Sequence, residues 1–220
     1  MSHIITPRWT RSQQVEERLS RGKQIYYVNG IPYYQGRHII HRDTQIDGGV
    51  SIGATPREAI VVDSKYPAIK ELYEKAKRKA SKRGIVRRDW VLESSYDVVL
   101  EAMPLRDDNN ERVEELTKNL GVNNDVKIDL GYFLERGIGV CRHYALACGV
   151  LLELFKKDNY ISGTPSIDRN QRLFDAHVWC RYTSSDNQIM ILDPSSRWLG
   201  LLEESLKRGS WDYRRPEEIK

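Results

Sequence analysis

Apolar residues recur at helical spacing through the middle of the chain. One face of the first such segment carries only apolar side chains, namely Leu72, Tyr73, Ala76 and Ala80. Helices are predicted over 67–82, 94–103 and 110–120, with Gly84, Pro104 and Gly121 as breakers. The stretch GIGVCRHYALACGVLLELF, residues 137–155, is the most apolar segment with this spacing, and it predicts a helix in the core.

Strand-like patterns follow this helix. The runs RLFDAHVWCRYT, residues 172–183, and IMILDPSS, residues 189–196, are joined by a turn-rich SSDN, whereas the polar stretch 156–171 predicts a loop. A helical half followed by a hairpin half predicts an α+β fold.

The first 65 residues have a different pattern. IYYVNGIPYYQ, residues 25–35, predicts a β-hairpin with a type I′ turn at Asn29-Gly30, and Pro32 places its second strand at a sheet edge. We expect an N-terminal extension with this small β-structure over 1–65, a catalytic domain over 66–210 and a C-terminal tail over 211–220. Nothing in the extension suggests chemistry.

Composition indicates one globular domain with an appendage. The 220 residues are 40% hydrophobic and 30% charged, and no segment approaches the apolar length of a membrane span. The N-terminal residues lack an apolar stretch followed by a cleavage site, and three cysteines do not make a disulfide framework. We expect a cytoplasmic protein; one exported without a cleaved signal would have the same composition.

The formal net charge of +4 is concentrated in KAKRKASKRGIVRR, residues 75–88. Apolar residues run beneath these charges, so the run predicts a solvated helix face. It has no interleaved aromatic residues and no accompanying recognition motif, so nucleic acid is not an expected partner. Attraction of acidic protein surfaces is the alternative role.

Cys141 stands at the first turn of the predicted core helix, after Gly137 and Gly139. Free N–H groups and the helix dipole at this position favour a thiolate, and they also suit a developing oxyanion. Cys148 falls on the same helix face two turns later, about 10 Å away, which is too far for a disulfide. We expect Cys148 to be a core residue.

A reactive thiol needs a base, and the base needs an orienting group. His143 lies about 200° around the helix from Cys141, which leaves His177 as the candidate base. With a loop over Ser184–Asp186, His177 lies directly opposite Asp193, whose carboxylate can then reach its Nδ1. The hypothesis requires a loop of odd length or a bulge.

Two other kinds of site fit less well. A zinc site would use Cys141, His143, His177 and Cys180, but no pair has CxxC spacing and Cys180 points away from His177 along a strand. GIGVCR begins like a dinucleotide fingerprint but has Arg142 where the third glycine belongs. We therefore expect neither a metal nor a cofactor.

GIGVCRHYALACGVLLE, DAHVWCRY and ILDPSSRW occur in this order over residues 90–205, and together they resemble the transglutaminase-like superfamily. The resemblance implies a papain-like core, in which a central cysteine-bearing helix packs on an antiparallel sheet. It implies that Cys141 is the nucleophile, His177 the base and Asp193 the orienting acid. Trp90 and Tyr132 are the candidates for the side-chain oxyanion donor of that family.

These residues predict a cysteine enzyme that transfers an acyl group from an amide of a protein or peptide. Water is the favoured acceptor, which would make the protein a peptidase or deamidase. A protein-glutamine transglutaminase forming isopeptide cross-links is one alternative, and a non-catalytic interaction module is another. The sequence does not determine the oligomeric state.

Overall fold

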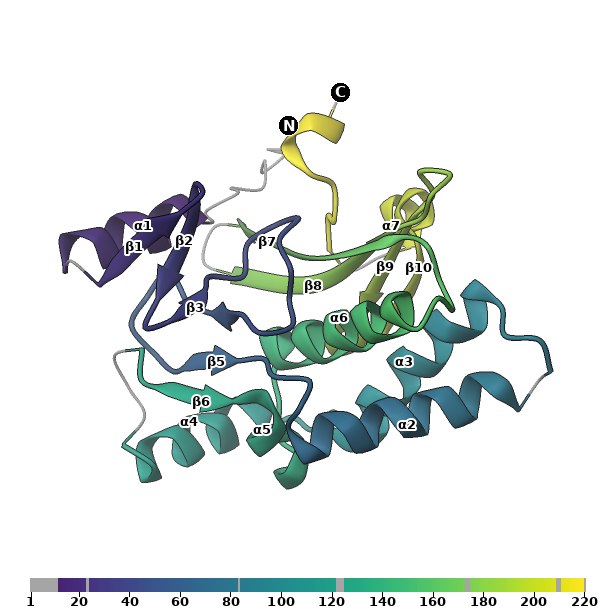
Figure 1. The fold of residues 1–220 in the computed structure, drawn as a ribbon, viewed down its shortest axis with the longest axis horizontal. Coiled ribbons are helices and arrows are strands. Elements are labelled where there is room, and N and C mark those ends of the chain that lie inside the picture. The colour runs from purple at the N-terminus through teal and green to yellow at the C-terminus, as the bar shows by residue number, and fades with distance from the viewer. Residues whose placement is uncertain are drawn as a thin grey trace, which may run out of the picture.

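The computed structural model describes residues 12–22, 24–82, 84–121, 125–172, 175–208 and 211–219 and has an α+β fold (Figure 1). The N-terminal part contains α1 (Ser12–Arg21), β1 (Ile25–Val28), β2 (Ile31–Tyr34), β3 (Arg37–His38), β4 (Val50–Ser51) and β5 (Ala59–Val61). The middle contains α2 (Pro67–Ser81), α3 (Arg88–Ala102), α4 (Asn109–Asn119), β6 (Lys127–Asp129), α5 (Leu130–Arg136) and α6 (Cys141–Lys157). The last part contains β7 (Thr164–Arg172), β8 (Asp175–Thr183), β9 (Ile189–Asp193), η1 (Pro194–Ser196), β10 (Trp198–Leu201), α7 (Leu202–Arg208) and η2 (Pro216–Glu218).

The described strands form three sheets. The largest is antiparallel with strand order β10-β9-β8-β7, and the other two have the orders β1-β2-β3 and β4-β5-β6. Within the last of these, β5 and β6 are parallel. This pairing joins the N-terminal region to the segment that leads into α5 and α6.

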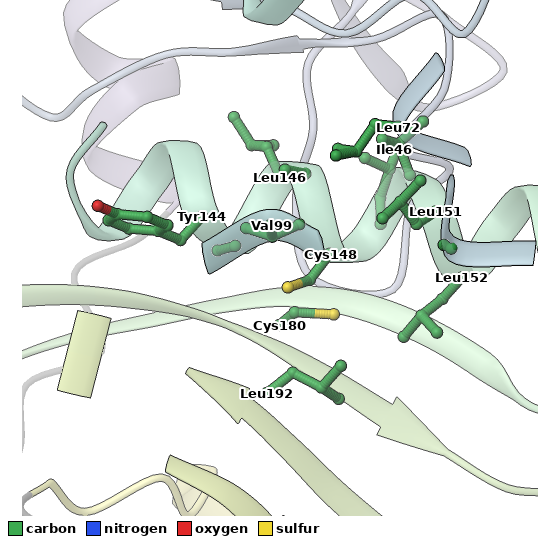
Figure 2. Packing of buried hydrophobic residues seen from close by; sticks show 14 of the residues in the cluster. Ile46, Leu72, Val99, Tyr144, Leu146, Cys148, Leu151, Leu152, Cys180 and Leu192 are labelled. Atoms are coloured by element: carbon green, nitrogen blue, oxygen red, sulfur yellow. The ribbon is translucent and has the colours of Figure 1, made fainter. Parts of the chain in front are cut away.

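Helix α6 lies between the antiparallel sheet on one side and α2 and α3 on the other (Figure 1). Its buried side chains include Cys148 and Leu152, which face Cys180 and Leu192 of the sheet in Figure 2. Full burial of a leucine side chain contributes about 1.5–3 kcal/mol, so a helix apolar on nearly all sides is held in place by the core. The predicted core helix is confirmed, as is the burial of Cys148, which is 0% exposed.

The turn between α5 and α6 places Cys141 at the first position of α6. Gly137 ends α5 with φ 61°. This left-handed conformation is unfavourable for any residue that has a side chain, and glycine avoids the penalty. A Cβ on Gly139 would lie 2.7 Å from the sulfur of Met103, so this glycine lets α3 approach the turn. The two glycines thus shape the turn and its packing.

The predicted helices agree with α2 and α4 to within about one residue at each end, which is the usual uncertainty of helix boundaries. The helix predicted over 94–103 corresponds to α3, but the predicted start is too late, because α3 begins at Arg88. Ser94 and Ser95 donate their hydroxyls to the carbonyl of Val91 within the helix. Serines bonded in this way are compatible with a helix interior.

The predicted loop over 156–171 is wrong in its second half, where Thr164–Arg172 forms the edge strand β7. Ser166, Asp168 and Asn170 are buried along this strand. The guanidinium of Arg215 donates to the side chains of Ser166 and Asp168. Because polar partners replace apolar packing there, the strand lacks the hydrophobic alternation that would have revealed it. The predicted strand over 172–183 is β8 from Asp175 onward, and residues 173 and 174 lie outside the described residues.

The N-terminal hairpin is confirmed, with positive φ at Asn29 and Gly30 and pairing of β1 with β2. The prediction that Pro32 lies in an edge strand is wrong, because β2 is the middle strand of its sheet. β3 pairs only with Tyr33 and Tyr34, so the missing N–H of Pro32 interrupts no strand pairing on that side.

Ile46 and Ile60 from the region before residue 65 lie in the same hydrophobic cluster as α6. The division of the chain at residue 65 remains a prediction.

Basic residues of α2 form ion pairs with acidic residues of α3: Lys75 contacts Glu101, and Lys79 contacts Asp97.

Within the described part of the chain, no single helix is long and apolar enough to cross a membrane. Among the described helices, α5 and α6 together have the length and apolar composition of a membrane span, but the chain bends by 108° between them.

Candidate active site

The candidate site lies where β9 ends and α6 begins. β8 and β9 pair only over Cys180–Thr183 and Ile189–Leu192, so the earlier part of β8, with His177, extends beyond β9. η1 follows Asp193 directly and contacts α6. The fold therefore gathers at one place three segments that are far apart in sequence.

His177 and Asp193 are hydrogen-bonded, with 2.6 Å between His177 Nε2 and Asp193 Oδ2. We had expected the carboxylate to reach Nδ1, and this detail is wrong. Because Nε2 is turned toward Asp193, Nδ1 is the ring nitrogen left for Cys141.

Asp193 is 1% exposed and is held by several donors. Ser195 donates its hydroxyl to Oδ1 at 2.6 Å, and the backbone N–H of Ser196 donates to the same oxygen at 3.2 Å. Tyr213 donates its hydroxyl to Oδ2 at 2.8 Å. Burial raises the pKa of Asp193, but the hydrogen bond and charge of His177, with the two serines, outweigh it and lower this pKa. The carboxylate stays ionised.

The His177 ring is enclosed by aromatic residues. Its centroid lies 5.0 Å from that of Trp211 and 6.0 Å from that of Trp179, which is fully buried. Burial lowers the pKa of His177, but hydrogen bonds to Asp193 and Cys141 and the charges of both outweigh burial and raise it to about 10. The imidazole is therefore held in its protonated form.

Cys141 is partly exposed, whereas Cys148 and Cys180 are buried, and all three thiols are free. Burial raises the pKa of Cys141, but the hydrogen bond and charge of His177, followed by the charges of Arg142 and Arg57, give a net lowering. Burial raises the pKa of both Cys148 and Cys180. The thiolate is thus favoured at one cysteine of the three.

The hairpin has the predicted odd-length loop, but its register differs from the predicted one. Cys180 pairs with Leu192 and Thr183 with Ile189, which makes the loop two residues longer than Ser184–Asp186. Trp179, and not His177, is therefore level with Asp193. A shift by two residues keeps side chains on the same face, so His177 still reaches the carboxylate diagonally.

His143 takes no part in this arrangement. Its ring is 0% exposed, its Nδ1 accepts the N–H of Val140, and it packs against Phe133 with ring centroids 4.1 Å apart. Burial, followed by the charge of Arg142, lowers its pKa well below the ordinary value, so the ring is neutral.

Cys180 lies in the core beside Cys148 (Figure 2). Among the described residues, no group of three His, Cys, Asp or Glu side chains is placed to hold a metal.

The candidates for a side-chain oxyanion donor lie on two helices. Tyr132 of α5 lies beneath the guanidinium of Arg136, 3.2 Å from ring centroid to carbon, and Trp90 of α3 lies against Arg87. The N–H groups of Cys141 and Arg142 are in the first turn of α6, where backbone donors have no acceptor within a helix. These two groups are the better-placed donors for an oxyanion at Cys141.

Two features of the site were missed at the sequence level. Tyr213 and Trp211 belong to the predicted tail, yet they contact Asp193 and His177. Arg57 belongs to the region in which we expected no chemistry, yet its charge acts on Cys141. The only signal in the sequence was the aromatic and basic character of WDYRR at 211–215.

Comparison of the chain with protein-family models, with curated proteins and with solved structures gives no match.

Proposed function

We propose that the protein is a cysteine enzyme of the transglutaminase-like type with a papain-like core. It would transfer the acyl group of a protein or peptide amide to water. The observation that carries the proposal is the hydrogen bond from His177 to the buried carboxylate of Asp193, beside a cysteine whose pKa is lowered by the same histidine.

In the proposed reaction, the Cys141 thiolate forms a bond to the amide carbonyl carbon and the carbonyl oxygen becomes an oxyanion. The N–H groups of Cys141 and Arg142 would stabilise that oxyanion. His177 gives its proton to the amide nitrogen, the carbon–nitrogen bond breaks, and ammonia or an amine leaves.

The resulting thioester is then hydrolysed. Neutral His177 takes a proton from water while the water oxygen bonds to the acyl carbon. The carbon–sulfur bond breaks, which releases a carboxylic acid and restores the thiolate and the imidazolium. Asp193 would orient the ring throughout and stabilise its positive charge whenever it is protonated, and Tyr213, Ser195 and Ser196 hold Asp193.

A casein digestion assay tests this proposal. New primary amines would report cleavage of peptide bonds, ammonia would report deamidation, and incorporation of a fluorescent alkylamine would report cross-linking chemistry. We expect amines or ammonia without incorporation of the alkylamine, and loss of the product in Cys141→Ser. Equal product formation by Cys141→Ser and the wild type would contradict the proposal.

A further inference from the structure

Arg57 lies near the first turn of α6, where its charge acts on Cys141, but its guanidinium contacts no carboxylate among the described residues. Among the residues that the structure describes, it forms no ion pair, and its Nε atom is buried without a hydrogen-bond acceptor. An unpaired charge in a partly buried position is costly, so such a group is usually paired with a carboxylate or a ligand.

The neighbouring carboxylates are already paired with other arginines. Arg18 contacts Asp125 at 2.5 Å, and Arg142 donates from Nε to Glu58 at 2.5 Å. Asp125 and Glu58 are 2% and 4% exposed. Three guanidinium groups therefore lie near two carboxylates, and Arg57 is the one that bonds neither, although the charges of Glu58, Cys141 and Asp125 still act on it.

The chain holds Arg57 in a fixed position. A Cβ on Gly53 would lie 2.4 Å from Arg57 Nε, so the arginine side chain lies directly against the backbone of this glycine. The backbone carbonyl of Arg57 accepts the N–H of Asp125 at 2.6 Å. Because Nε is covered, the terminal nitrogens are the part of the guanidinium that remains for a ligand.

The position of Arg57 is close to the reacting sulfur. Glu58, the next residue, bonds Arg142, which directly follows Cys141. Burial, followed by repulsion from Arg142, lowers the pKa of Arg57 to about 10, and the charge of Arg57 acts on Cys141 in turn. An anion between the two arginines would relieve this repulsion.

We propose that Arg57 binds a carboxylate of the substrate beside the amide that Cys141 attacks, so that the enzyme selects acidic substrates. A carboxylate carries the single negative charge that one unpaired guanidinium needs, and it matches the two terminal nitrogens geometrically. The inference rests on the function proposed above. In this inference, Arg57 is a residue that determines which substrates the enzyme accepts.

Two alkylating agents of nearly equal size test this inference. Iodoacetate carries a carboxylate where iodoacetamide carries an amide. With either reagent the Cys141 sulfur bonds to the methylene carbon, the carbon–iodine bond breaks and iodide leaves. The quantity measured is the ratio of the two second-order rate constants at Cys141 in the full chain, mapped by mass spectrometry. In Arg57→Gln we expect the iodoacetate-to-iodoacetamide ratio to fall about tenfold or more, as for loss of a charge-assisted hydrogen bond.

Arg88→Gln is the matched control. It also removes one guanidinium, but from a site beside Asp186 and Gln188, and its ratio should equal that of the wild type. If Arg57→Gln does not fold, Arg57→Lys replaces it, because lysine keeps the charge but lacks the paired planar donors. The Lys variant should also have a lower ratio.

A ratio that stays at the wild-type value in the Arg57 variants, with rapid iodoacetamide labelling of Cys141, would overturn this inference and leave the proposed function standing. Slow labelling of wild-type Cys141 by both reagents would instead overturn the proposed function, and the inference with it.

Discussion

Tyr213 donates its hydroxyl to Asp193 Oδ2, the same oxygen that bonds His177 Nε2. Tyr213 is 0% exposed and packs in a cluster with Trp179, Ile191 and Leu202. The C-terminal segment is therefore part of the candidate site, because it holds the carboxylate that orients the imidazole.

Tyr213→Phe removes this hydrogen bond and leaves the ring in place. We expect the free energy of unfolding to fall by about 1 kcal/mol, the usual value for one hydrogen bond. Because Asp193 is then held by one donor fewer, it orients the His177 ring less firmly, and alkylation of Cys141 near pH 6 should slow. Thermal unfolding and alkylation rates measure the two effects.

Tyr73→Phe serves as its control. Tyr73 donates to Asp158 at 2.8 Å, away from the site, so its loss should affect stability without affecting Cys141. Equal effects of the two substitutions on alkylation would show that Tyr213 acts through general stability.

Asp193→Asn keeps the shape of the side chain and removes its charge. We expect the free energy of unfolding to fall by about 1–3 kcal/mol near pH 6, as for a hydrogen bond between charged groups. The raised pKa of His177 stabilises the fold fully below about pH 6.5, and this contribution is lost as the pH rises through about 10. The lowered pKa of Asp193 stabilises the fold above about pH 3.9, and this contribution is lost as the pH falls further.

The difference in stability between the wild type and Asp193→Asn should therefore be largest between about pH 4 and 6.5. Urea unfolding at pH 3, 6 and 10 measures it. A difference of the same size at all three values would mean that the two residues do not form a charged pair.

Gly137→Ala introduces a side chain at φ 61°, in the turn before Cys141. We expect a loss of about 1–2 kcal/mol for an L-residue in the left-handed region. The added Cβ would also lie 3.3 Å from the carbonyl of Ala102, so the turn should shift and Cys141 should be alkylated more slowly. Unfolding and alkylation are again the measurements.

Gly121→Ala is the matched variant, with φ 63° and no atom within 4 Å of the added Cβ. It should lose similar stability and keep the wild-type reactivity of Cys141. If both variants keep that reactivity, the geometry of the turn at Gly137 does not control the thiol.

The sequence was sufficient to place Cys141 at the start of a core helix, because the apolar spacing and the two glycines are local signals. It was also sufficient to bring His177 and Asp193 to one end of a hairpin, since alternation along strands fixes the face of each side chain. The register was wrong by two residues because the polar loop carries no apolar residue to mark where pairing stops.

Other features depend on contacts that no local pattern encodes. β7 was missed because Asp168, 0% exposed, is buried against Arg215 from the far end of the chain. The same holds for Tyr213, whose partner Asp193 is 20 residues away. Arg57 reaches the site only because β5 pairs with β6, which leads into α5 and then α6.

The most direct measurement is the rate of iodoacetamide alkylation of each cysteine between pH 5 and 9, in the wild type and in His177→Gln. The account predicts that Cys141 alone reacts rapidly near pH 6, that Cys148 and Cys180 stay unmodified, and that His177→Gln shifts the reaction of Cys141 to higher pH. Slow labelling of all three cysteines near pH 6, with a rise only near the pH of an ordinary thiol, would contradict it.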